Sequence, residues 1–235
     1  MTTQTRRSRC RLADTAAGLL AIALLASDAG AHELKSAKAD FIPPAPGTYR
    51  LERIQPVPEG AVLDTSSKPL RLSQYTRGRI TLLSLIYTSC SDAAGCPMAL
   101  YSLQQVRRDL EKRKSMHGRV RLVSLSFDPA HDTPEAMRAY GNSETSRRSA
   151  VPWYFLTTAS PRDLRPILDG LGQDVRVPAD AAAAAKAGNI SHTVKVFLID
   201  RDGWVREIYT SSFLVPQVIV NDVQTLLLED GVKIH

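Results

Sequence analysis

Residues 80–98 have the sequence ITLLSLIYTSCSDAAGCPM, and this stretch decides the fold. Its first eight residues are almost all apolar, which predicts a strand covered on both faces. A loop with two thiols, Cys90 and Cys96, follows, and Pro97 stands where a helix begins. A buried strand that ends in paired cysteines at a helix start predicts a site for sulfur chemistry or for a soft metal.

Helices and strands alternate on the carboxyl side of this stretch. Short broken runs over residues 48–72 predict a β-hairpin before the central sheet. The order of elements predicts an α/β, thioredoxin-like fold with an N-terminal β-hairpin extension, in which parallel crossovers end in an antiparallel edge. We expect helices over residues 97–114, about 134–140, 160–171 and 215–228, the third of them capped by Ser160 with Pro161 next. Strands are expected over residues 80–87, 120–127, 153–157, 194–200 and 204–209.

The first 31 residues have the pattern of a signal peptide. Four arginines precede an apolar run at 16–26, and Ala29-Gly30-Ala31 supplies a cleavage site, so the mature chain would begin at His32. An uncleaved anchor, which would leave the protein associated with the membrane, is the alternative, but the apolar run is short for a span. We therefore expect export to the periplasm, a linker or arm over 32–47, and one domain over 48–235.

Composition restricts the partners. The 235 residues are 43% hydrophobic and 23% charged, as in an ordinary globular protein. Removal of the predicted signal peptide, which carries four arginines and two aspartates, lowers the net charge from +6 to +4. No cluster of basic and aromatic residues is present, which argues against nucleic acid binding.

Two cysteines remain in the mature chain, because Cys10 lies within the predicted signal peptide. Since Pro97 disfavours helical geometry at the preceding residue, Cys96 should lie at the helix amino terminus, where the helix dipole would lower its thiol pKa. A structural disulfide is the alternative for an exported protein, although the bridge would close only a small loop and stabilise little.

His192 is the candidate third partner of the two thiols. It begins the predicted strand next to the cysteine loop, so an imidazole there can complete a site with two sulfurs and one nitrogen. Such a donor set suits Cu(I), accepts Cu(II) and leaves zinc one ligand short. The alternative is an ordinary polar residue at a strand edge.

Three motifs resemble the Sco/SenC family of exported copper proteins. They are Leu85-Ile86-Tyr87-Thr88-Ser89-Cys90 before Cys96-Pro97, then residues 126–135 (SFDPAHDTPE), and then Ser191-His192-Thr193 before residues 197–200 (FLID). The resemblance covers about residues 48–229.

The resemblance implies one copper per chain, bound by Cys90, Cys96 and His192, with Asp128 beside the ligands. It also implies that the protein delivers copper to, or reduces the thiols of, the dinuclear copper site of cytochrome c oxidase subunit II. Another cuproprotein client and a thioredoxin-like reductant are further partners that it allows. Two features depart from the family pattern: five residues, rather than three, separate the cysteines, and Ser191 precedes the histidine where the family has Asp.

Other readings stay open. The cysteine pair alone is also compatible with an exported thiol-disulfide oxidoreductase, and Thr88 before Cys90 resembles peroxidase sites faintly. A structural binding module is a further alternative. Outside the ligand set, we expect His131 to face solvent, Met98 to pack and His32 to bind copper weakly at best. Asp132 or Thr133 can cap the helix that begins near Pro134, and helix capping and the helix dipole explain Asp132 and Glu135 better than acid-base catalysis does.

Overall fold

The computed structural model describes residues 1–2, 40–93, 95–145, 149–176 and 191–234. The chain divides into two units at residue 33, and only the unit from Leu34 onward is considered below. The predicted signal peptide, apart from its first two residues, and His32 lie outside the described residues. No helix in the described ranges combines the length and the apolar character that a membrane span requires.

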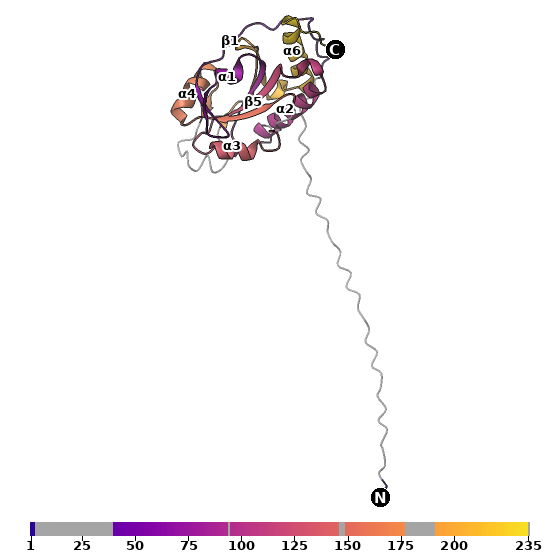
Figure 1. Ribbon diagram of the computed structural model, residues 1–235, viewed down its shortest axis with the longest axis vertical. Coiled ribbons are helices and arrows are strands. Elements are labelled where there is room, and N and C mark those ends of the chain that lie inside the picture. Colours follow the sequence, from indigo (N-terminus) through magenta and orange to yellow (C-terminus); the bar gives the residue numbers. More distant parts are fainter. Residues whose placement is uncertain (3–39, 94, 146–148, 177–190, 235) are drawn as a thin grey trace. The chain divides into compact units, whose positions relative to one another are not determined.

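A single sheet organises this unit. Within the described residues it has eight strands in the order β1-β10-β9-β4-β5-β6-β2-β3 (Figure 1). At its centre β4 (Ile80–Ile86) is parallel to β5 (Val120–Ser126), which is parallel to β6 (Trp153–Thr157). On the other side of β4, β9 (Lys195–Ile199) and β10 (Trp204–Thr210) form the antiparallel edge. This arrangement confirms the predicted thioredoxin-like α/β fold.

The N-terminal hairpin extends the same sheet. β2 (Ala61–Asp64) pairs with β3 (Pro69–Arg71) and also with β6. The two-residue strand β1 (Gln55–Pro56) pairs instead with β10, at the opposite edge. The residues before the main sheet therefore contribute strands to both of its edges.

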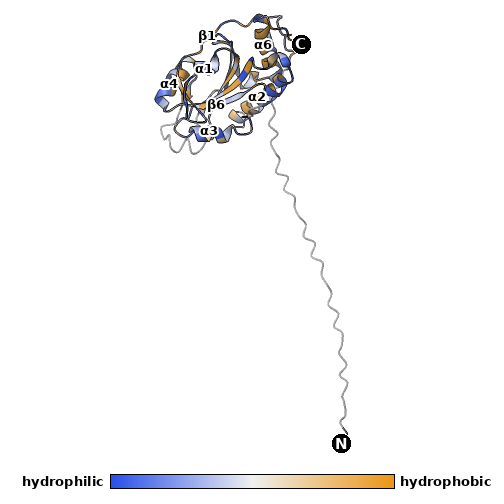
Figure 2. Cartoon of the chain, in the orientation of Figure 1, coloured by the Kyte–Doolittle hydropathy of each residue, from blue (hydrophilic) through white to orange (hydrophobic). Residues whose placement is uncertain are grey.

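Helices cover the sheet, with apolar residues gathered on the strands and polar residues toward the outside (Figure 2). Two helix starts follow the sequence prediction. Thr133 caps α3 and Ser160 caps α4, each followed by a proline. The helical elements are α1 (Ser73–Thr76), α2 (Cys96–Glu111), η1 (Lys114–Met116), α3 (Pro134–Tyr140), α4 (Pro161–Gly170), η2 (Ser211–Phe213) and α6 (Pro216–Glu229).

Residues 44–47 lie against α6. The Asn221 side chain donates to the Pro44 carbonyl at 2.8 Å, and the Gly47 amide donates to the Thr225 hydroxyl at 3.0 Å. These two hydrogen bonds attach the end of the predicted arm to the last helix.

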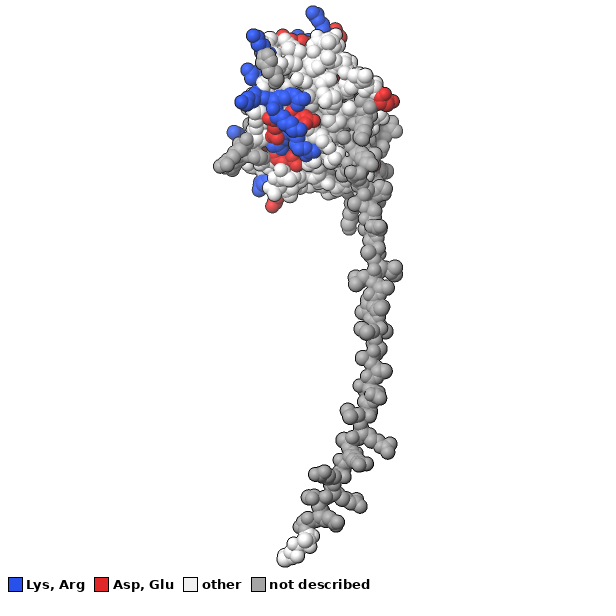
Figure 3. Space-filling model, turned by 90° about the vertical axis from the view of Figure 1, so that its right-hand side faces the viewer, with Lys and Arg blue, Asp and Glu red and all other residues white. Residues whose placement is uncertain are grey.

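Charged side chains of both signs lie together on the face shown in Figure 3. Along α2, the nearly buried Arg107 pairs with Glu111 one turn later and with Glu144, which lies beyond α3. Its guanidinium also donates to the Glu144 carbonyl. Arg107 therefore fastens the segment after α3 to α2.

A polar chain crosses the buried centre of the sheet. Ser84 of β4 and Ser124 of β5 are paired in register, and their hydroxyl oxygens are 2.8 Å apart. The indole of Trp153 on β6 donates to the Ser124 hydroxyl at 3.0 Å. All three residues are buried, so Ser124 satisfies polar groups on both neighbouring strands.

We predict that Ser124→Ala lowers the free energy of unfolding by about 1–3 kcal/mol, because it leaves the buried Trp153 N–H without an acceptor. Ser84→Ala is the matched control and should cost less, since Ser124 would still accept from Trp153. Urea denaturation of the two variants measures the difference. Equal losses would show that the Trp153 hydrogen bond does not carry the effect.

Candidate metal centre

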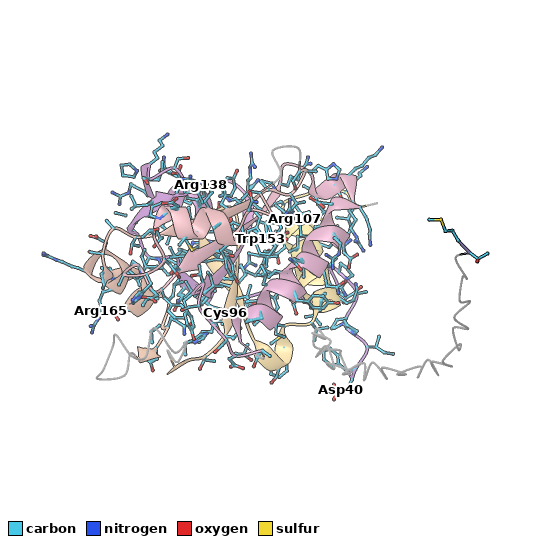
Figure 4. The ribbon with its side chains drawn as sticks, turned by 90° about the horizontal axis from the view of Figure 1, so that it is seen from below. Asp40, Cys96, Arg107, Arg138, Trp153 and Arg165 are labelled. Atoms are coloured by element: carbon cyan, nitrogen blue, oxygen red, sulfur yellow. The ribbon has the colours of Figure 1, made fainter. Side chains whose placement is uncertain are left out.

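The cysteine loop leaves the carboxyl end of β4 and folds through two turns. The Cys90 amide donates to the Tyr87 carbonyl, and the Gly95 amide donates to the Asp92 carbonyl at 2.8 Å. α2 then begins at Cys96, with Pro97 in its first turn. Figure 4 labels Cys96 at this helix start. The strand end and the helix start thus hold the two cysteines close together.

His192 approaches the cysteines from a separate short strand. It lies in β8 (Ser191–His192), which pairs with β7 (Val175–Arg176), rather than at the start of β9 as expected from the sequence. The side-chain amide of Gln173 donates to the carbonyl of Thr193, the residue after His192. These contacts fix the backbone that carries the imidazole.

Aromatic rings surround the imidazole. The Phe127 and Tyr87 ring centroids lie 4.8 Å and 5.4 Å from that of His192. Both aromatic residues follow the last residues of the central strands β4 and β5. The sequence reasoning missed them as site residues, although their position directly after two buried parallel strands is the signal that identifies this edge of the sheet.

The structure brings the three predicted ligand residues together. Nε2 of His192 lies 3.6 Å from Sγ of Cys96, and the two sulfurs and an imidazole nitrogen all lie within 4.8 Å of one another. Cys96 is buried, whereas Cys90 and His192 are half-buried. Two thiols and one imidazole form a soft donor set that fits Cu(I) and tolerates Cu(II).

The two thiols have opposite electrostatic environments. A hydrogen bond from the Cys96 thiol, followed by backbone hydrogen bonds from Cys96 and Asp92, lowers the pKa of Cys90 to about 5. The hydrogen bond to Cys90, together with burial, raises the pKa of Cys96. The prediction that Cys96 is the activated thiol is therefore wrong. The amide at the helix start points its N–H at the sulfur of Cys90, so the helix terminus stabilises the other thiolate.

Asp132 connects the cysteine loop to β5. Its buried carboxylate accepts hydrogen bonds from the Thr88 amide and hydroxyl at 3.0 and 2.5 Å, and from the Ser126 hydroxyl at 2.5 Å. Of the two predicted caps of α3, Asp132 and Thr133, the structure uses Thr133. Burial raises the pKa of Asp132, and the three hydrogen bonds oppose that rise.

The remaining candidates make contacts with residues outside the ligand set. The Asp128 carboxylate is 3.0 Å from Nδ1 of His131, whose side chain faces solvent as expected. Met98 is buried, and its sulfur accepts a hydrogen bond from the Ser102 hydroxyl at 3.8 Å. This confirms that the Met98 side chain packs in the core. Glu135 lies in the first turn of α3, where the helix dipole favours a negative charge.

Known proteins give a consistent picture. The family model described as SCO1/SenC matches residues 62–228. No curated protein matches the sequence.

Three solved structures share the fold. Apo Sco1 from Thermus thermophilus is 26% identical, with a TM-score of 0.58, and the match covers 77% of this chain and 96% of that one. Copper-bound ScoI from Bradyrhizobium japonicum is 23% identical, with a TM-score of 0.56 and coverages of 72% and 98%. BsSco, described as having a disulfide switch and as a member of the Sco family of cytochrome c oxidase assembly proteins, is 21% identical, with a TM-score of 0.54 and coverages of 82% and 98%.

The family match extends from the first strand of the hairpin to the last helix and includes all three residues of the candidate site. Because it spans well over half of the sequence, this chain belongs to the SCO1/SenC family.

Proposed function

We propose that this protein is an exported copper chaperone that binds one copper ion through Cys90, Cys96 and His192. The observation that carries the proposal is the convergence of two sulfurs and one imidazole nitrogen within 4.8 Å. Copper is here the cargo, and the soft donor set is suited to holding it as Cu(I). Family membership and the copper-bound ScoI structure support the same metal.

The environment of the three side chains suits transfer of the ion. Cys96 is buried, whereas Cys90 and His192 keep part of their surface accessible. An incoming ligand from a client protein can therefore reach the ion beside Cys90 and His192 while Cys96 still holds it. We propose that the client is the dinuclear copper site of cytochrome c oxidase subunit II or another cuproprotein. The description of BsSco as a member of a family of oxidase assembly proteins supports this role.

We further propose the chain organisation that goes with this role. Residues 1–31 would direct export to the periplasm, residues 32–47 would form an arm, and residues 48–235 would form the copper domain. If the first segment is not cleaved, the domain would stay attached to the membrane.

The reduced protein should bind one Cu(I) per chain, and His192→Ala should weaken that binding by a factor on the order of ten or more, equivalent to about 1.4 kcal/mol. The reason is the loss of the nitrogen donor while both sulfurs remain. Competition with a chromophoric Cu(I) chelator measures the affinity.

His117→Ala is the matched control for this experiment. His117 is exposed next to η1, where its Nε2 lies 2.8 Å from the Glu111 carbonyl. Its loss should leave copper affinity unchanged. An equal affinity of the His192→Ala variant and the unmodified protein would rule out the three-ligand site.

A second function is favoured by the unequal thiols. A half-exposed Cys90 thiolate beside a buried Cys96 thiol is the arrangement expected of an attacking and a resolving cysteine in thiol-disulfide exchange. Attack of the Cys90 thiolate on a client disulfide would form a mixed disulfide and release one client thiolate. Attack by Cys96 would then form the Cys90–Cys96 disulfide and release the second. The client would gain two electrons, and a thioredoxin-like reductant would return two to the pair.

Alkylation of Cys90 in the reduced, metal-free protein should follow the lowered pKa. Above pH 6 the thiolate predominates and the reaction with iodoacetamide should be fast. The rate should fall as the pH decreases through about 5, where the thiolate takes up a proton. Mass spectrometry of the alkylated peptides over pH 4–9 gives the rate for each cysteine.

Two variants test whether the Cys96 thiol causes the lowered pKa of Cys90. Cys96→Ser keeps a hydroxyl that can donate to Cys90 and should preserve most of the effect, whereas Cys96→Ala removes the donor and should move the midpoint to higher pH. A midpoint near the ordinary cysteine value of about 8.5 in the reduced protein would contradict the assigned asymmetry.

A further inference from the structure

Two glycine-arginine pairs lie side by side at the amino end of the sheet, opposite the cysteines. Gly78-Arg79 precedes β4 and Gly118-Arg119 precedes β5. Both glycines have left-handed backbones, with φ of +81° and +72°. Because the first residues of the two strands, Ile80 and Val120, are paired in register, Arg79 and Arg119 occupy equivalent positions on neighbouring parallel strands.

These two turns border a cavity of about 130 Å³. That volume exceeds the roughly 30 Å³ share of a liquid water molecule several-fold, so the cavity can hold a small ion. No atom lies within 4 Å of the position that a side chain would take at either glycine, which leaves this wall open. The cavity is lined by Gly78, Arg79, Ile80, Gly118, Arg119, Arg201, Leu227, Asp230 and Val232.

The lining carries an excess of positive charge. Asp230 is its one carboxylate, and it pairs with Arg201 at 3.2 Å. Among the described residues, neither Arg79 nor Arg119 forms an ion pair with a carboxylate. Three guanidinium groups and one carboxylate therefore leave the cavity with two uncompensated positive charges.

A fourth arginine close by adds to this potential. The guanidinium of Arg121 is buried and donates to neutral acceptors: the Thr81 hydroxyl and the carbonyls of Gln74 and Arg77. Burial, and secondarily the charge of Arg79, lowers its pKa to about 10, so it stays protonated at neutral pH. The amino ends of β4 and β5 thus gather four arginines. The further carboxylates that act on Asp230, those of Asp200, Asp202 and Glu229, do not line the cavity itself.

We propose that this cavity binds an oxyanion of the phosphate type, held by the side chains of Arg79 and Arg119 with Arg201 at the rim. Guanidinium groups donate in a planar fork that matches phosphate oxygens. The nearby backbone amides are already used, since Gly78 donates to the Arg201 carbonyl and Ile80 to the Arg119 carbonyl. Recognition would therefore depend on the arginine side chains.

The proposed site is independent of copper. The seven residues of β4 separate it from the cysteine loop by roughly 20 Å, at about 3.3 Å per residue. In Figure 1 the C-terminal end of the chain, which contributes Asp230 and Val232, lies at the top of the domain. Helix α3, which follows the loop that contains Asp132, lies at the bottom of the domain. Phosphate bound at one end of the domain would leave the thiols at the other end accessible.

The first test is calorimetric titration of the reduced full chain with inorganic phosphate at low ionic strength. We expect saturable binding of one phosphate, weakened about tenfold or more by Arg79→Gln and by Arg119→Gln, the size expected for the loss of a charge-assisted hydrogen bond. Asp230→Asn should act in the opposite direction and tighten binding, because it removes the carboxylate that competes for Arg201.

Matched controls come from an ion pair on α4. Arg165 and Asp169 pair at 3.2 Å on an exposed face, so Arg165→Gln and Asp169→Asn change the net charge by the same amounts and should leave phosphate affinity unchanged. Unaltered Cu(I) binding would show that each variant is folded. The proposal is overturned if neither inorganic phosphate nor the acidic vesicles described next bind, or if the Arg165→Gln variant loses as much phosphate affinity as the Arg79→Gln variant.

A second arm identifies the source of the phosphate group. Vesicles of phosphatidylcholine with and without phosphatidic acid are sedimented with the unmodified protein and with the Arg79→Gln variant. Binding to the acidic vesicles alone, lost in the variant, would assign a lipid headgroup as the ligand. Saturable binding of inorganic phosphate without vesicle binding would assign a free phosphate. Failure of both probes would overturn the site.

Discussion

The geometry of the thiol site depends on one buried carboxylate. Asp132 accepts two hydrogen bonds from Thr88, which begins the loop after β4, and one from Ser126, the last residue of β5. A carboxylate is costly to bury unless such partners satisfy it. Because all three donors lie at the two strand ends, the carboxylate ties the loop that leads to Cys90 to the end of β5. The same hydrogen bonds allow a loop rich in small residues to hold a defined path.

The different pKa shifts of the two thiols follow from the path of this loop. Cys96 belongs to the first turn of α2, where its amide has no partner within the helix and donates to the sulfur of Cys90. Its own sulfur is buried and gives its hydrogen to the same acceptor. Cys96 therefore supplies two hydrogen-bond donors, its amide and its thiol, to the sulfur of Cys90, which is half-buried. The amide at the helix start lowers the pKa of both thiols, but for Cys96 the hydrogen bond to Cys90 and burial outweigh it, so the net stabilisation falls on the Cys90 thiolate.

The sequence predicts the parts of the fold that depend on strong local patterns. All seven residues of β4 are buried, as their continuous apolar character indicates, and Ser160 and Thr133 cap helices where the rules place them. It does not predict β1 or the β7–β8 pair, because two-residue strands carry no periodicity and are stabilised by distant partners. The resemblance of three motifs to the Sco/SenC family predicts Cys90, Cys96 and His192 as the members of the site. Which thiol loses its proton first depends on where amides point, and that is a property of three-dimensional structure.

Local turns take up the length of the five-residue loop between the cysteines. A longer loop should separate two sulfurs unless local structure takes up its length. Here the Tyr87–Cys90 and Asp92–Gly95 hydrogen bonds fold the extra chain back on itself. Gly95 is suited to this turn, since a side chain there would lie 3.1 Å from the Asp92 carbonyl oxygen. The sulfurs consequently remain within 4.8 Å of each other and of the imidazole. The longer loop therefore leaves the donor set of two sulfurs and one imidazole nitrogen intact.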